Sequence, residues 1–278
     1  MDSLDNLKVS VVIRAGGTDV LLPQVIRHVQ EQSWNKIDEI LVVDCGLSKD
    51  VLSEVYNDFK AIRIIAYDII SFSHGHSLNI GMSEAHGDVV VILSGHAIPA
   101  NSDWLEKLIH HFDTEATAAV ASKLISMPRS AFHNHLLNLS FYLFHKPLKN
   151  RVHLIRNTSI AIRKTAWQKI KFNEALPACE DRVWLREVIG LGLSAYYEPD
   201  SVVFHSHDES WLTFWKRIAV LFIVRSRVDL EKLLGTAHTI GLRHPPVHES
   251  LPAQTISAVE HNDGRTQHRP PHTQGKPL

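Results

Sequence analysis

The chain has 278 residues, of which 44% are hydrophobic, and it carries a formal net charge of -1 with a pI near 7.0. This length and composition are ample for a globular core and exclude a disordered protein. The near-neutral charge argues against nucleic acid as a partner, since such proteins usually show a basic face. Two cysteines, Cys45 and Cys179, cannot form a disulfide framework, and no leader resembling a signal peptide precedes the first apolar run. We therefore expect a cytoplasmic protein.

The first half of the chain alternates short β-branched runs with amphipathic stretches, which predicts buried strands alternating with helices. We expect strands at 9–13, 39–44, 62–66 and 89–93, and helices at 21–32, 49–58, 77–85 and 101–112. This order favours an α/β fold with a mostly parallel sheet flanked by helices, where ligands bind at the carboxyl ends of the strands. The loops after Ile13, Val43 and Leu93 are the expected site.

The second half is less regular. Residues 128–151 fit a helix or a loop, and we expect a further helix from Glu180. Strands are expected at 159–163, 195–199 and 201–205, and a short helix at 164–170. The apolar segment 211–224 is interrupted by two basic residues and falls short of the ~20 residues that a membrane-spanning helix needs. It is either a core helix, which we favour, or a helix that lies on a membrane surface.

Histidine is unusually frequent, but its distribution weakens a simple metal-site interpretation. Six of the 19 histidines and six of the 12 prolines follow Gly235. That region has no sustained apolar period and cannot bury enough surface to offset its ordering entropy. The sequence thus predicts one domain over 1–235 and a disordered tail over 236–278.

Two adjacent carboxylates and two nearby histidines carry the clearest chemical signal. Glu180 and Asp181 open the expected helix, and His205 and His207 follow about two dozen residues later. A carboxylate can accept a proton, and neutral imidazoles can hold a divalent metal. The alternative is that the carboxylates only complement the dipole at the helix start.

Five segments in this order resemble the family 2 glycosyltransferases over about residues 8–208. They are Val11-Val12-Ile13 with its loop, Val42-Val43-Asp44-Cys45-Gly46-Leu47-Ser48, Leu78-Asn79-Ile80-Gly81 with Ala85-His86-Gly87-Asp88, Asn157 to Arg163 with Trp167, and Phe172-Asn173-Glu174 leading to Glu180-Asp181-Arg182-Val183-Trp184. The resemblance implies a GT-A fold, a nucleotide-sugar donor and single-displacement transfer that inverts the anomeric centre.

The resemblance also assigns roles to individual residues. Asp181 would be the catalytic base, with Glu180 as its neighbour, and Asp44 would contact the base or ribose of the donor, although a helix-capping role is the alternative for Asp44. The remaining residues expected on the donor side are Arg14, Ala15, Asn79, Ser94, His96, Asn157, Arg182 and Trp184. Asn157 could instead close an Asx turn, and Trp184 could instead be a buried helix residue.

The sequence departs from the family at the metal motif. Where relatives carry Asp-x-Asp, this chain has Ser94-Gly95-His96. One interpretation is that His96, with His205 or His207, holds Mn²⁺, Mg²⁺ or another divalent metal at the donor diphosphate. The other is that His96 only donates a hydrogen bond to a phosphate, while Arg14 or Arg182 supplies the charge.

Three functions remain open at this point. The leading one is an inverting glycosyltransferase acting on a saccharide or lipid-linked glycan, with peripheral membrane association at the inner face left open. A sugar-nucleotide-binding member of a glycan-assembly complex without turnover is the alternative, supported by the missing aspartates. A nucleotidyltransferase should carry a stronger phosphate loop than Arg14-Ala15-Gly16-Gly17.

Overall fold

The computed structural model describes residues 6–17, 19–67, 72–128 and 143–206, together with positions 4, 130, 132, 135, 136, 138, 139, 215, 216, 219 and 223. His207, the expected tail over 236–278 and most of segment 211–224 therefore lie outside the described residues.

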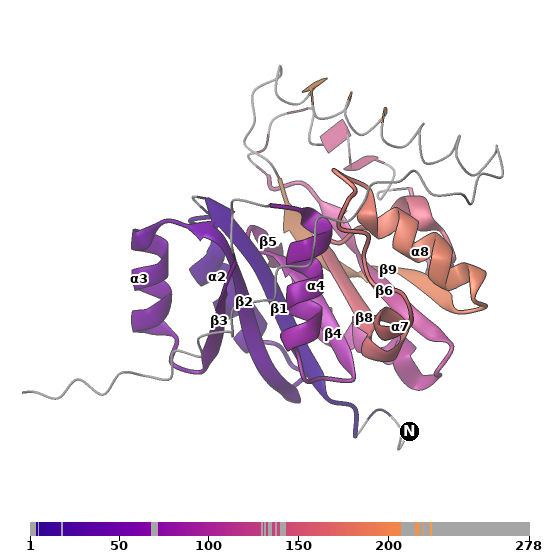
Figure 1. The fold of residues 1–278 in the computed structure, drawn as a ribbon, viewed down its shortest axis with the longest axis horizontal. Coiled ribbons are helices and arrows are strands. Elements are labelled where there is room, and N and C mark those ends of the chain that lie inside the picture. The colour runs from indigo at the N-terminus through magenta and orange to yellow at the C-terminus, as the bar shows by residue number, and fades with distance from the viewer. Residues whose placement is uncertain are drawn as a thin grey trace, which may run out of the picture. The chain divides into compact units, whose positions relative to one another are not determined.

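The described part of the chain forms one nine-stranded sheet in the order β3-β2-β1-β4-β8-β6-β9-β5, with β7 also paired to β9 (Figure 1). The strands are β1 (Val9–Gly17), β2 (Ile37–Leu47), β3 (Ile62–Ala66), β4 (Val89–Ser94), β5 (Ala97–Pro99), β6 (Thr117–Ile125), β7 (Leu148–Lys149), β8 (Ser159–Arg163) and β9 (Ser194–His205). Strands β1, β2, β3, β4, β6 and β9 run in one direction, and β5, β7 and β8 oppose them. The expected mostly parallel sheet is confirmed.

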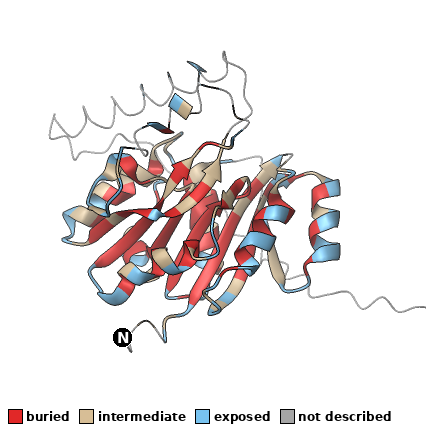
Figure 2. Ribbon diagram, turned by 180° about the vertical axis from the view of Figure 1, so that it is seen from behind, coloured by how far each residue is buried: buried red, intermediate tan, exposed pale blue. Residues whose placement is uncertain are grey.

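Helices cover both faces of this sheet (Figure 1). The helices are α2 (Leu22–Gln30), α3 (Lys49–Asp58), α4 (His74–Glu84), α5 (Trp104–Ile109), α7 (Lys164–Lys169) and α8 (Glu180–Gly190), with 3-10 turns η2 (His110–Asp113) and η3 (Val152–Leu154). The core of one face contains side chains of α2, α3 and α5, and that of the other contains side chains of α4, α7 and α8. Buried residues concentrate in the strands between these layers (Figure 2).

Strand periodicity explains why one sheet can serve two cores. In β1, Val11 and Ile13 belong to the core with α2, whereas Val12 belongs to the core with α4. Successive side chains of a strand point to opposite faces, so an uninterrupted β-branched run fits a strand that is covered on both sides.

The hydroxyl of Ser48 accepts a hydrogen bond from the Val51 N–H at 3.4 Å and caps α3.

Several elements differ from the sequence-based expectation. Strand β6 was not predicted, because its alanine-rich sequence has weak strand propensity and its burial between β8 and β9 supplies the preference instead. The two strand pieces expected around Pro199 form one strand, β9. The helix expected at 101–112 is shorter, since α5 ends at Ile109 and Phe112 has non-helical torsions.

Candidate active site

The strand register brings the expected loops to one edge of the sheet. Arg14 at the end of β1 lies beside Ser94 of β4, and Ala15 lies beside Asp44 of β2. His205, at the end of β9, pairs with Ala97 of β5, next to His96. Because parallel strands end at the same edge, side chains from distant parts of the sequence meet there.

Asp44 shapes its own loop with one carboxylate oxygen. Its Oδ1 accepts hydrogen bonds from the N–H groups of Gly46 at 2.9 Å and Leu47 at 2.6 Å. This is an Asx-type turn at the carboxyl end of β2, and the residue that caps the following helix is Ser48 instead. In the described structure no partner is recorded for Oδ2 of Asp44, which leaves that oxygen available as an acceptor.

The carboxylate pair stands at the start of α8. Glu180 is buried, and its Oε1 accepts a hydrogen bond from the Asn157 side-chain amide at 2.6 Å. Half-buried Asp181 accepts from the Asn157 N–H at 3.3 Å and from the Arg182 N–H at 2.7 Å. Asn157 therefore contacts both carboxylates. Among the described residues these are its hydrogen bonds, and they do not form the Asx turn considered as the alternative.

Burial changes the acidity of this pair. Burial and the neighbouring charge of Asp181 raise the pKa of Glu180 to about 7, against the opposing effects of Arg14 and the Asn157 hydrogen bond. Burial also raises the pKa of Asp181, although the Arg182 N–H and the charges of Arg182 and Arg156 oppose it. The two carboxylates interact, so the protonation of one depends on that of the other.

The residue that precedes the pair has an unusual backbone. Cys179, the N-cap of α8, is left-handed with φ 65° and ψ 19°. A branched residue tolerates this region poorly, so we expect Cys179→Val to lower the free energy of unfolding by about 1–3 kcal/mol. Denaturant unfolding measures this, with Val183→Ala as a control on the same helix. An unchanged midpoint for Cys179→Val would show that the turn relaxes without cost.

A cluster of polar side chains beside the Ser94 loop includes Asp19, which no sequence motif indicated. Asp19 Oδ1 lies 3.2 Å from Nδ1 of His96, and the rings of His96 and His205 stack with centroids 4.9 Å apart. Burial raises the pKa of Asp19, but the hydrogen bonds from His96 and the Gly16 N–H outweigh it and leave the pKa below its usual value. A Cβ on Gly95 would stand 2.5 Å from that of Ala15, so glycine permits this close loop contact.

This cluster offers a metal an incomplete set of ligands. Within the described ranges, no group of three or more histidine, cysteine, aspartate or glutamate side chains is arranged to hold a metal ion. Asp19 and His96 lie 3.2 Å apart and supply one carboxylate and one imidazole, so an ion there would need most of its ligands from donor phosphates and water. Imidazole suits a borderline transition metal better than Mg²⁺. His207 cannot be placed, because it lies outside the described residues.

Two of the expected donor-side residues have structural roles instead. The side chain of Asn79 donates to Phe172 O and Glu174 Oε1 and accepts from the Trp167 indole and the Phe172 N–H. Its amide is thereby fully occupied. Trp184 is 1% exposed and donates its indole N–H to Ile170 O at 2.6 Å, so it is a core residue and not an acceptor wall. Both residues fix the segment that leads into α8.

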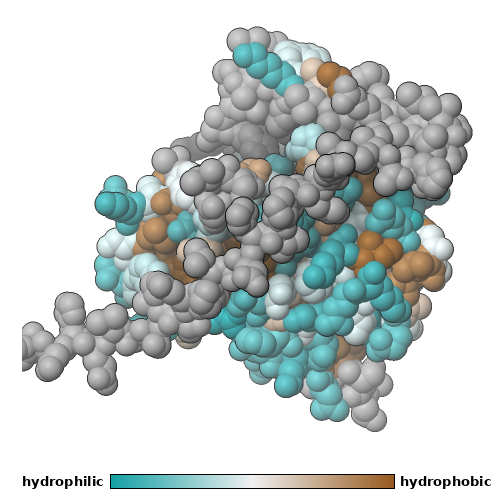
Figure 3. Space-filling view, viewed as in Figure 1, coloured by the Kyte–Doolittle hydropathy of each residue, from teal (hydrophilic) through white to brown (hydrophobic). Residues whose placement is uncertain are grey.

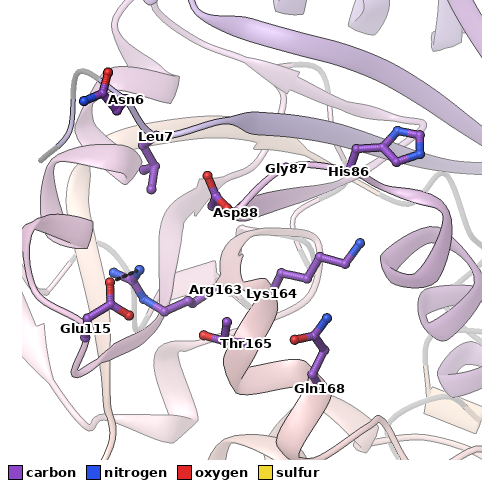
Figure 4. Close-up of a pocket in the computed structure, with 10 residues that line it drawn as sticks. All are labelled: Asn6, Leu7, His86, Gly87, Asp88, Glu115, Arg163, Lys164, Thr165 and Gln168. Carbon is purple, nitrogen blue, oxygen red and sulfur yellow. Dashed lines mark hydrogen bonds and ion pairs between the residues drawn. The ribbon is translucent and has the colours of Figure 1, made fainter.

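A cavity of about 490 Å³ lies at the other edge of the sheet, where β4 begins and β8 ends (Figure 4). Its basic groups are already engaged: Arg163 bonds Glu115 and three backbone carbonyls, and Lys164 donates to Ala85 O. We assign no donor site there. Hydrophilic side chains predominate on much of the described surface near α7 (Figure 3).

Comparison with known proteins identifies similar sequences and similar folds. The O-antigen chain rhamnosyltransferase RfbN of Salmonella typhimurium is 26% identical over 213 residues, which cover 73% of this chain and 67% of that protein. The mannosyltransferase PcManGT of Pyrobaculum calidifontis, solved with GDP-Man and Mn²⁺, aligns with a TM-score of 0.59 at 16% identity, covering 75% of this chain and 59% of that one. S. aureus TarS (residues 1–349) with UDP-GlcNAc also aligns at 0.59 and 16% identity, covering 73% and 60%.

The alignment thus covers about three fifths of each of these two solved structures. Among the residues that the structure describes, no helix is long and apolar enough to cross a membrane. The family model described as "Glycosyl transferase family 2" matches residues 10–175, more than half of the chain. With this match and the GT-A architecture of the solved relatives, the chain belongs to glycosyl transferase family 2.

Proposed function

We propose that this protein is an inverting glycosyltransferase that moves a sugar from a nucleotide-sugar donor to a hydroxyl of a saccharide or lipid-linked glycan. The observation that carries the proposal is the Glu180–Asp181 pair, which is held by Asn157 and has a raised pKa. The similarity to an O-antigen rhamnosyltransferase favours a deoxyhexose donor and an envelope-glycan acceptor. A lipid-linked acceptor would bring the protein to the inner face of a membrane.

In this mechanism the acceptor oxygen attacks the anomeric carbon while the bond from that carbon to the donor diphosphate breaks. Asp181 takes the hydroxyl proton, and the carboxyl group of Glu180 lies beside the carboxyl group of Asp181. A base whose pKa lies near the working pH is efficient, because much of it is deprotonated while its affinity for a proton remains high. Arg14 at the end of β1 supplies positive charge toward the leaving diphosphate, where fixed cations stabilise the transition state.

We propose that a divalent cation, Mn²⁺ or Mg²⁺, takes part at the His96 loop. His96 would hold it, with Asp19 and His205 beside the same position. When bound, such an ion would neutralise negative charge on the diphosphate. Mn²⁺ in the solved PcManGT complex supports divalent metal use among proteins of this fold.

A panel of nucleotide sugars with a glycan acceptor mixture tests the function, with and without Mn²⁺. We expect one donor to raise the melting temperature and to release free nucleoside diphosphate only when acceptor is present. Donor binding without release would favour the non-catalytic alternative, and pyrophosphate release would indicate a nucleotidyltransferase. Donor affinity that is insensitive to chelators would contradict the metal proposal alone.

Asp44 gives a second test on the nucleotide side. Asp44→Asn can keep the Oδ1 hydrogen bonds to Gly46 and Leu47 but loses the charged acceptor at the second oxygen. We expect donor affinity to fall about 10–100-fold, because a hydrogen bond to a charged group contributes about 1.5–3 kcal/mol. Turnover at saturating donor should change little. Calorimetry measures the affinity, with exposed Asp58→Asn as the control, and equal affinities would refute the role of Asp44.

A further inference from the structure

The guanidinium of Arg14 has an unusual partner. Its Nη1 lies 2.5 Å from Nδ1 of His74, the first residue of α4, 60 residues away in the chain. Among the described residues, Arg14 forms no ion pair with a carboxylate. Its charge nevertheless acts to lower the pKa of Asp19 and of Glu180. An arginine at the carboxyl end of the central strands thus bonds to an imidazole and not to an acid.

The chemistry of this contact fixes the state of the ring. A guanidinium can only donate, so Nδ1 of His74 must accept and the ring proton must lie on Nε2. Burial, together with the charge of Arg14, lowers the pKa of His74 to about 4. The ring is therefore neutral at physiological pH. A neutral partner orients the guanidinium without cancelling its charge, as a carboxylate would.

His74 is itself held by several contacts. Its ring meets that of Phe72 edge to face at 5.0 Å, and its carbonyl accepts from the Ser77 hydroxyl at 3.0 Å. A Cβ on the next residue, Gly75, would stand 2.6 Å from Asn173 O, so this turn packs directly on the segment before α8. The start of α4, which carries His74, is thereby packed against the segment that leads to Glu180 and Asp181.

We propose that His74 is a positioning residue that aims the Arg14 guanidinium at the donor diphosphate. The inference rests on the proposed function, because it requires a diphosphate ligand at the end of β1. It assigns a role to the His74 side chain, which none of the family-like segments includes. As a specific consequence, replacing His74 should weaken binding of the nucleoside diphosphate and leave binding of the nucleoside nearly unchanged.

The test compares His74→Leu, which removes the acceptor, with His74→Asn, whose side-chain oxygen can replace Nδ1. UDP, GDP and dTDP are titrated by calorimetry, and the matching nucleosides by ligand-observed NMR. For the diphosphate that binds wild type, we expect His74→Leu to weaken binding about 10-fold or more, with nucleoside binding changed less than about twofold. His74→Asn should recover most of the loss. His86→Leu, an exposed histidine at the other edge, is the matched control.

A double-mutant cycle adds a readout that a purely structural role would not move. Arg14→Leu should weaken diphosphate binding at least as much as His74→Leu, and adding His74→Leu to Arg14→Leu should cost little more. Additive losses, equal losses for diphosphate and nucleoside, or no rescue by His74→Asn would each overturn the inference. If wild type binds none of the three diphosphates, the proposed function fails; if wild type binds one of them and the His74 variants behave in any of these three ways, only the positioning role fails.

Discussion

Asp181→Asn should lose about 10²–10⁴-fold in the rate of glycosyl transfer, the usual contribution of a general base. The amide keeps the shape of the side chain and can still accept from the Arg182 N–H, but it cannot take the proton of the acceptor hydroxyl. Donor affinity should stay close to that of wild type, because the carboxylate acts on the acceptor. Single-turnover transfer and donor calorimetry together measure the two effects.

The matched control for Asp181→Asn is Glu187→Gln, which removes an exposed carboxylate from the same helix. It should transfer at nearly the wild-type rate. Near-normal turnover by Asp181→Asn would remove Asp181 as the base. If Glu180→Gln instead abolishes transfer in that case, the base is Glu180, whose buried carboxylate lies next to it.

The second large effect is on pH dependence. Burial raises the pKa of Asp181, the proposed base, so the acid limb of kcat/KM should lie at higher pH than an ordinary aspartate would give. Two pH units below the apparent pKa of that limb, the rate should be about 100-fold lower than at the plateau. Glu180→Gln removes the neighbouring negative charge, so the acid limb should move to lower pH. A limb that stays in place would show that another group controls it.

The raised pKa of Glu180 predicts how stability depends on pH. A carboxyl group whose folded pKa exceeds its ordinary value of 4.5 favours folding most below that value, and this contribution is lost as the pH rises through about 7. Glu180→Gln removes this loss, so it should stabilise the protein more at pH 8 than at pH 5. Denaturant midpoints at the two pH values measure the difference.

The sequence by itself determined the local elements and the order of the family-like segments. The strands at 62–66 and 159–163 and the helix at 49–58 were predicted with the observed bounds, because the apolar runs and amphipathic stretches that mark them are local signals. The ends of the apolar runs predict where the strands end, so the sequence also indicated the edge of the sheet at which the site lies. The expected tail remains a prediction, because it lies outside the described residues.

Only the tertiary structure decided which polar side chains face one another. Asn79 and Trp184 looked like donor contacts, yet their hydrogen bonds are used inside the protein. Asp19 and His74 carried no motif, yet the ends of β1 and β4 place Asp19 against His96, and the start of α4 places His74 against Arg14. Side-chain partners across a sheet edge depend on register and loop path, which sequence spacing does not encode.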